Sequence, residues 1–253
     1  MSFKKKIFAA NWKLNKSPEE ARRFVIQLKN DIFSQEKQAG DFFNDKEIIL
    51  FPSAFAMEAV STLCAGTKIF FGPQNISNEK SGAFTGENSA VVAQELKSQF
   101  ALVGHSERRA LFFESDHLLN KKNILLQSLG MTTVFCIGET LQQRQENKTL
   151  DVCFTQIETG LKGCAVQDRL IVAYEPVWAI GTGQVATIDQ VQEVHLALFQ
   201  KLQKMGFNNF QLLYGGSVKA DNAQALLQVP HVDGFLIGGA SLEVESFLKI
   251  CRA

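Results

Sequence analysis

The sequence predicts an α/β protein, a single closed (β/α)8 barrel that spans residues 1–253. Eight short apolar or alternating segments recur along the chain and begin roughly every 20 to 40 residues, the spacing of a strand plus a crossover helix. Helical patterns fill the intervals, and about 250 residues is the usual length of such a barrel. No linker rich in Pro, Gly or Ser divides the chain, so one domain is expected. A doubly wound open sheet is the main competing arrangement.

The expected strands share a short run of apolar residues bounded by polar or turn-forming ones. In chain order they are Lys6–Asn11, Glu47–Phe51, Lys68–Gly72, Phe100–Val103, Thr132–Ile137, Arg169–Ala173, Phe210–Tyr214 and Val232–Ile237.

Two helices have clear sequence signals. Ser17 is expected to cap a helix that has Pro18 at its first position and acidic residues in its first turn. Thr187 opens a second helix that ends at Gly206, and its expected buried face comprises Val191, Val194, His195, Leu198 and Leu202. The polar segment Ser34–Asp45 has no clear pattern and is expected to be a surface connection.

Charge and cysteine content exclude several classes of partner. Lys plus Arg and Asp plus Glu each number 26, so no basic excess favours nucleic acid or an anionic membrane surface. No stretch approaches 18 apolar residues, and the first residues lack the apolar region of a signal peptide. The five cysteines are an odd number without metal-ligand spacing. They indicate a reducing cytoplasmic location and no metal site.

Candidate catalytic residues lie where the expected strands end, which is where (β/α)8 barrels carry their active sites. Asn11 ends the first strand and Lys13 follows it, His105 and Glu107 follow the fourth, and Glu175 follows the sixth. A lysine there supplies positive charge to an anionic ligand. An alternative for Lys13 is a solvated surface lysine, and an alternative for Glu175 is a structural ion pair.

His105 precedes Ser106, which is expected to cap a helix. The positive end of a helix disfavours the imidazolium, so His105 is expected to be neutral and able to donate a hydrogen bond to a carbonyl. A purely structural histidine is the alternative. His195 lies on an apolar helix face and is expected to pack.

The segment after Glu175 is uncharged, largely apolar and contains glycine, which is unusual for a surface loop. We expect residues 176–186 to form a lid that excludes water from a working carboxylate. Within it, Gly181–Ala186 matches a dinucleotide-binding fingerprint. The match is rejected because six residues separate it from the strand end and no acid follows at the required distance. No cofactor is expected.

Glycine pairs follow the seventh and eighth strands, at Gly215-Gly216-Ser217 and Gly238-Gly239. Without a Cβ, the backbone can turn its N–H groups toward an anion, and barrels of this kind commonly bind phosphate there. Tight strand-to-helix turns are the alternative, but two pairs on adjacent strands favour phosphate.

Six blocks in order, NWKLN, GHSERR, VFCIGET, AYEPVWAIGTG, YGGSV and VDGFLIGGASL, together resemble the triosephosphate isomerase family. The resemblance runs from Asn11 to Leu242 and implies the TIM-barrel fold. It also implies interconversion of dihydroxyacetone phosphate and D-glyceraldehyde 3-phosphate through an enediolate, in glycolysis and gluconeogenesis. The resemblance further implies the established arrangement of that family, in which a glutamate base is paired with a neutral histidine beneath a closing loop.

The resemblance also implies roles. Glu175 is similar to the base that moves the proton, His105 to the neutral electrophile, and Lys13 to the group that stabilises enediolate and phosphate charge. Asn11 would contact substrate, and Glu107 is similar to a carboxylate near that lysine. The phosphate would be held by Gly181, Ser217, Gly238 and Gly239.

The polar segment at residues 74–87, with Thr85 near its tip, is similar to the family loop that inserts into a partner subunit. A homodimer is therefore expected. Two other functions remain possible: another phosphate-binding barrel enzyme such as a lyase or epimerase, and a catalytically silent relative kept for binding. The presence of Lys13, His105 and Glu175 argues against the silent relative.

Overall fold

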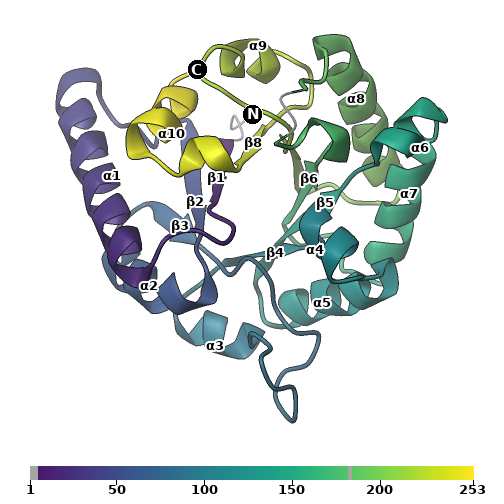
Figure 1. The fold of residues 1–253 in the computed structure, drawn as a ribbon, viewed down its shortest axis with the longest axis horizontal. Helices are drawn as coiled ribbons and strands as arrows, with labels where there is room; N and C mark the ends of the chain where they lie inside the picture. Colours follow the sequence, from purple (N-terminus) through teal and green to yellow (C-terminus); the bar gives the residue numbers. More distant parts are fainter. Residues whose placement is uncertain (1–4, 182–183) are drawn as a thin grey trace.

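The computed structural model describes residues 5–181 and 184–253. Over these residues, eight parallel strands form one sheet in the order β3-β2-β1-β8-β7-β6-β5-β4, with helices around it (Figure 1). The strands are β1 (Lys6–Asn11), β2 (Lys46–Phe51), β3 (Ile69–Phe71), β4 (Phe100–Val103), β5 (Thr132–Ile137), β6 (Leu170–Tyr174), β7 (Phe210–Tyr214) and β8 (Gly234–Ile237). Each predicted strand is confirmed, with bounds that differ by at most two residues.

The barrel closes between β3 and β4. The Leu102 amide donates to the Pro73 carbonyl at 3.0 Å, and the Ser98 hydroxyl donates to the Phe71 carbonyl at 3.2 Å. On the other side of the ring, β1 pairs with β8 in parallel register. Neighbouring strands therefore follow chain order around the ring, with no reversal at a switch point. The (β/α)8 prediction is confirmed and the doubly wound alternative is wrong.

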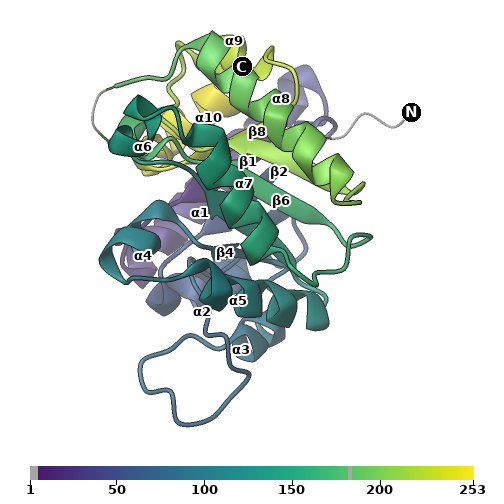
Figure 2. The same ribbon diagram turned by 90° about the vertical axis from the view of Figure 1, so that its right-hand side faces the viewer.

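The helical segments lie outside the strands, except for short ones at the strand ends (Figures 1 and 2). They are α1 (Pro18–Ala39), η1 (Ala54–Ala56), α2 (Met57–Cys64), α3 (Ala90–Glu95), α4 (Ser106–Leu111), α5 (Asp116–Ser128), α6 (Leu141–Gln145), α7 (Thr149–Gly160), η2 (Val177–Ala179), α8 (Ile188–Lys204), α9 (Ala223–Leu227), η3 (Gly239–Ser241) and α10 (Val244–Cys251).

Two apolar layers hold the fold together. The inner layer fills the barrel with alternate strand residues, including Ile7, Phe51, Phe100 and Leu213. The outer layer packs the remaining strand residues against the helices. Because both faces of each strand are buried, the strands read as nearly continuous apolar runs, which made them recognisable in the sequence.

The two helix starts are confirmed. Ser17 and Glu20 form a reciprocal capping box at α1, and Thr187 does the same with Gln190 at α8. The apolar face of α8 is buried as predicted, including His195. Such caps satisfy N–H groups that the first helical turn leaves unpaired.

The prediction of a surface connection at Ser34–Asp45 is wrong for its first half. Helix α1 continues to Ala39 and ends at Gly40, whose φ of 88° is accessible to glycine. The residues from Gln35 to Lys37 have good helix propensity, so this polar segment extends α1 as a helical turn that faces solvent. Only residues 40–45 form the connection.

Residues 72–89, between β3 and α3, project from the barrel as a long loop (Figures 1 and 2). At its root, the Gln74 side chain donates to the carbonyls of Lys13 and Phe51, each at 2.8 Å. The base of this loop therefore supports the backbone after β1.

Candidate active site

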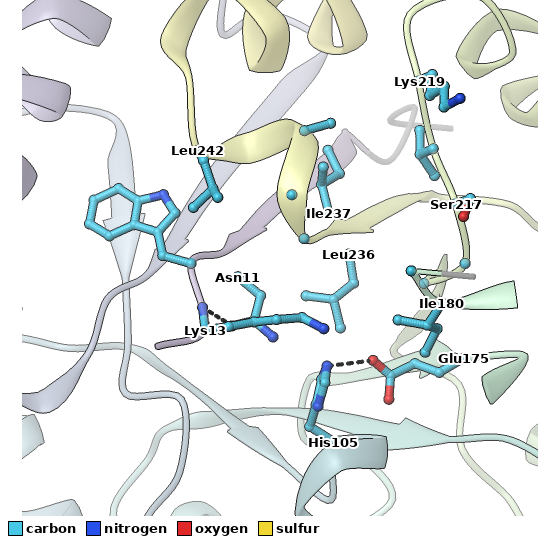
Figure 3. Close-up of a pocket in the computed structure, with 18 of the residues that line it drawn as sticks. Asn11, Lys13, His105, Glu175, Ile180, Ser217, Lys219, Leu236, Ile237 and Leu242 are labelled. Carbon is cyan, nitrogen blue, oxygen red and sulfur yellow. Dashed lines mark hydrogen bonds and ion pairs between the residues drawn. The ribbon is translucent and has the colours of Figure 1, made fainter. Parts of the chain in front are cut away.

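A cavity of about 310 Å³ opens at the carboxyl ends of the strands (Figure 3). It brings together side chains from strand ends that are far apart in sequence, as expected for a (β/α)8 barrel, whose active site lies at the carboxyl ends of the strands. Among the described residues, its lining comprises Asn11, Trp12, Lys13, Asn15, His105, Glu175, Ile180, Gly181, Gly215, Gly216, Ser217, Val218, Lys219, Leu236, Ile237, Gly238, Gly239, Ala240 and Leu242. Of the predicted site residues, only Glu107 does not line it.

Lys13 is held in an unusual backbone conformation, with φ of 52°. Its amide donates to the buried Asn11 Oδ1 at 3.0 Å, and Gln74 holds its carbonyl. Its ammonium pairs with Glu107 Oε1 at 2.6 Å. A non-glycine residue adopts this conformation only where its surroundings enforce it. Asn11 therefore orients Lys13, and Glu107 acts on the cavity through the lysine.

His105 is the N-cap of α4, with Ser106 as the first helical residue, so the prediction that Ser106 is the cap is wrong. The reason is that His105 Nδ1 itself accepts the Glu107 amide at 3.2 Å. The ring proton must then lie on Nε2, which is 3.1 Å from Glu175 Oε1. The imidazole is thus fixed as a donor that points from the rim into the site (Figure 3).

Glu175 is buried, and both of its carboxylate oxygens are engaged. Oε2 accepts the Ser106 amide at 2.9 Å, and Oε1 accepts from His105. Burial raises the pKa of Glu175, but the His105 ring and these hydrogen bonds outweigh burial, so its pKa lies below the usual range. Glu175 is therefore ionised at neutral pH in this arrangement.

Burial lowers the pKa of His105, yet the neighbouring Glu175 carboxylate outweighs burial and raises that pKa above its ordinary value. The sequence expectation of a neutral ring considered only the helix end. If the Glu175 carboxylate turns away from His105, it no longer raises the pKa of the ring. Burial and the Glu107 amide at Nδ1 then favour the neutral ring.

The glycines after β7 and β8 serve different purposes. A Cβ on Gly215 would lie 2.9 Å from Glu175 Cγ, and one on Gly216 would lie 2.2 Å from the Tyr214 hydroxyl oxygen, so these two are required for packing. A Cβ on Gly239 would meet open space at the cavity. The tight-turn interpretation therefore fits the first pair, while the second pair leaves backbone accessible to a ligand.

The predicted lid begins with Pro176 and passes through η2; Thr182 and Gly183 lie outside the described residues. Gly181 is exposed with φ of 68°, at the rim of the cavity. Ser217 Oγ donates to the Ala179 carbonyl at 2.7 Å, so the loop after β7 contacts the lid directly.

Sequence reasoning missed Glu139, which follows β5 and is fully buried. Its carboxylate accepts from the Trp178 indole at 2.9 Å and from the Tyr174 hydroxyl at 3.1 Å. Its carbonyl accepts the Val177 amide at 3.1 Å. Glu139 thus anchors the start of the lid. Because Glu139 follows the end of β5, the expectation that polar residues at strand ends are functional could have identified it as well.

No cluster of three or more His, Cys, Asp or Glu side chains that could hold a metal ion occurs within residues 5–181 and 184–253. Among helices of the described ranges, none has the length and apolar character of a membrane-spanning segment.

Comparison with known proteins identifies the family. The family model described as Triosephosphate isomerase matches residues 6–253. The chain is 52% identical over 246 residues to the triosephosphate isomerase of Bdellovibrio bacteriovorus, covering 97% of this chain and 98% of that one. It is 41% identical over 254 residues to that of Marinobacter nauticus, covering 99% and 98%. It is 40% identical over 255 residues to that of Geotalea uraniireducens, covering 98% of each. With the strand-end cavity and its glutamate, histidine and lysine, these matches show that the chain belongs to the triosephosphate isomerase family.

Proposed function

We propose that this chain, one domain over residues 1–253, interconverts dihydroxyacetone phosphate and D-glyceraldehyde 3-phosphate, a step of glycolysis and gluconeogenesis. The observation that carries the proposal is the meeting of Glu175, His105 and Lys13 in one cavity of a chain of this family. The cavity, about 310 Å³, is at the small end of ligand sites and suits a three-carbon phosphate.

The reaction moves one proton between neighbouring carbons and needs no external oxidant, reductant or cofactor. Glu175 takes a proton from the carbon beside the carbonyl, which leaves an enediolate. His105 Nε2–H donates to the oxygen on which negative charge develops, and the ammonium of Lys13 stabilises that charge. A second proton passes from the hydroxyl oxygen of the first carbon to the former carbonyl oxygen of the other, with the His105 ring between them as donor and acceptor. Glu175 returns its proton to the former carbonyl carbon, so substrate and product are isomers.

Glu175 has to move for this to occur, because its two oxygens are held by Ser106 and His105. Leaving these donors raises its basicity, since fewer hydrogen bonds then favour the carboxylate. Closure of residues 176–186 over the substrate would exclude water and protect the enediolate. The apolar character of Val177, Trp178 and Ile180 suits that task.

The phosphate of the substrate would lie against Gly181, Ser217, Gly238 and Gly239, with backbone N–H groups as donors. Support comes from the open space beside Gly239 and from the contact between Ser217 and the lid. Asn11 contributes by orienting Lys13 toward the same ligand.

We also propose a homodimer in which residues 74–87, with Thr85 near the tip, insert into a partner copy. Phe84 in this loop is 47% exposed, and Leu14 and Phe55, which follow the adjacent strands β1 and β2, are 98% and 90% exposed. Because β1, β2 and β3 are neighbours in the sheet, the segments that follow them leave the barrel on the same side, and exposed apolar side chains there favour a protein interface. A cytoplasmic location is proposed from the five free cysteines, a reduced state typical of that compartment.

The test is the rate at which the purified protein converts either triose phosphate into the other, followed by NMR of the two isomers. The wild type is expected to turn over with a kcat in the range typical of enzymes, about 1–10³ per second. A folded wild type without turnover would refute the proposed function. Binding of inorganic phosphate without turnover would then favour a silent relative.

A further inference from the structure

Gln156 of α7 makes a paired contact with the backbone beside the catalytic glutamate. Its side-chain oxygen accepts the Gly138 amide at 2.8 Å, and its side-chain nitrogen donates to the Gly138 carbonyl at 3.1 Å. Gly138 is the first residue after β5 and is buried. Buried peptide groups that have left a strand ladder need other partners, and Gln156 supplies both.

Gly138 lies directly against Glu175. A Cβ at residue 138 would stand 1.8 Å from the Glu175 carbonyl oxygen and 2.6 Å from its carbonyl carbon. The residues on either side of Gly138 hold the same segment. The Ile137 carbonyl accepts the Glu175 amide at 2.7 Å, and the Glu139 carbonyl accepts the Val177 amide at 3.1 Å. A shift of Gly138 therefore shifts the backbone from which the glutamate side chain leaves β6.

The space beside this segment explains why a hydrogen-bonded clamp is needed there. A second cavity, of about 230 Å³, is lined by Gly138, Gln156, Glu175 and Val177 among others. On the side of this cavity the segment has fewer packing contacts, so the hydrogen bonds from Gln156 contribute more to its position. Gln156 lines this cavity, and its amide ties the loop to α7, a 12-residue helix packed on the barrel.

We propose that Gln156 is a positioning residue for the isomerisation. Through Gly138 it fixes the backbone of Glu175, and through the adjoining Glu139 it fixes the start of the lid. The proposal rests on the function proposed above. Gln156 does not line the cavity that would take the substrate, so its effect on turnover is exerted through these neighbours.

The chain contains a matched control. Gln127 of α5 makes the same paired contact with the backbone of Ala165, with a side-chain oxygen to amide distance of 2.8 Å and a side-chain nitrogen to carbonyl distance of 3.1 Å. Ala165 precedes β6, at the amino end of the barrel, opposite the site. Both glutamines are half-buried in helices. Substitution of either one by methionine removes two hydrogen bonds with little change of shape.

The experiment compares Q156M with Q127M for kcat, KM, the inhibition constant of inorganic phosphate and Tm. We expect similar losses of Tm, a kcat for Q156M at least fivefold below that of Q127M, and phosphate inhibition constants within threefold of each other. A kcat ratio below fivefold, or a loss confined to KM and phosphate affinity, would overturn the positioning role. Should Q156M not fold, Q156E and Q127E, which keep the acceptor, are compared against the same threshold. An inactive wild type would instead refute the proposed function.

Discussion

The Nε2 atom of His105 lies 3.1 Å from Oε1 of Glu175, although the two residues belong to strand ends 70 positions apart. The contact joins the two groups that the proposed reaction would use on opposite sides of the substrate. It fixes the proton on Nε2 and keeps the glutamate ionised. It is also a resting contact, because substrate must come between the two side chains for proton transfer to occur.

Glu175→Gln is expected to lower kcat by about 10³-fold or more, because an amide cannot accept the substrate proton. The fold is expected to remain, since an amide of the same size still accepts the Ser106 amide. Isomerisation rates with circular dichroism of both proteins check this. A variant that retains a tenth of wild-type turnover would mean that another group is the base.

Lys13→Met is expected to lower kcat/KM by at least about 10²-fold, because it removes the charge that stabilises a developing oxyanion. The methionine stem preserves the packing near Gly238, where the lysine Cε lies 3.4 Å from the position that a Cβ on this glycine would take. Lys204→Met, at an exposed helix end, is the control and should leave kcat/KM unchanged. Equal kcat/KM values for the two variants would mean that Lys13 is a solvated surface lysine with no role in the reaction.

His195 predicts a pH dependence of stability. Its Nδ1 donates to the His231 carbonyl at 3.0 Å, and Nε2 is buried with no hydrogen-bond partner among the described residues. Burial lowers the pKa of His195 to about 4. Between that value and the unfolded pKa of about 6.5, the unfolded chain binds the proton and the folded chain does not. This contribution to stability is therefore complete above the unfolded pKa and is lost as the pH falls through that window.

His195→Gln keeps a donor for the His231 carbonyl and cannot be protonated. From pH 7.5 to pH 5, urea unfolding should show the wild type losing about 2 kcal/mol more than this variant. His117→Gln, at an exposed histidine, should behave as the wild type does. Parallel losses for wild type and His195→Gln would show that the buried ring does not titrate as argued.

Thr85→Arg is expected to weaken the proposed dimer, because a long charged side chain at the loop tip would have to be buried in the partner. Sedimentation velocity at micromolar protein should show twice the monomer mass of 28.1 kDa for the wild type and a larger monomer fraction for the variant. Leu196→Glu, on the exposed side of α8, serves as the control. A wild type that sediments only as a monomer would remove the dimer.

Much of the fold could be read from the sequence because its signals are local. A strand buried on both faces is an apolar run, and a capped helix begins with Ser or Thr and acidic residues, as at Ser17 and Thr187. The end of α1 cannot be predicted from the sequence, because a solvent-facing helix and a polar loop have similar compositions. The cap of α4 cannot be predicted either, because the hydrogen bond of the His105 ring depends on its rotamer.

The sequence alone determined the order of eight strand–helix units and which polar residues follow each strand, since these depend on neighbours in the chain. Only the tertiary structure decided which of those residues touch. It paired Glu175 with Ser106 and His105, buried Glu139 under the lid, and joined Gln156 to Gly138. The physical reason is that hydrogen bonds and desolvation act over a few ångströms in space. Barrel closure alone brings strand ends far apart in sequence within that distance.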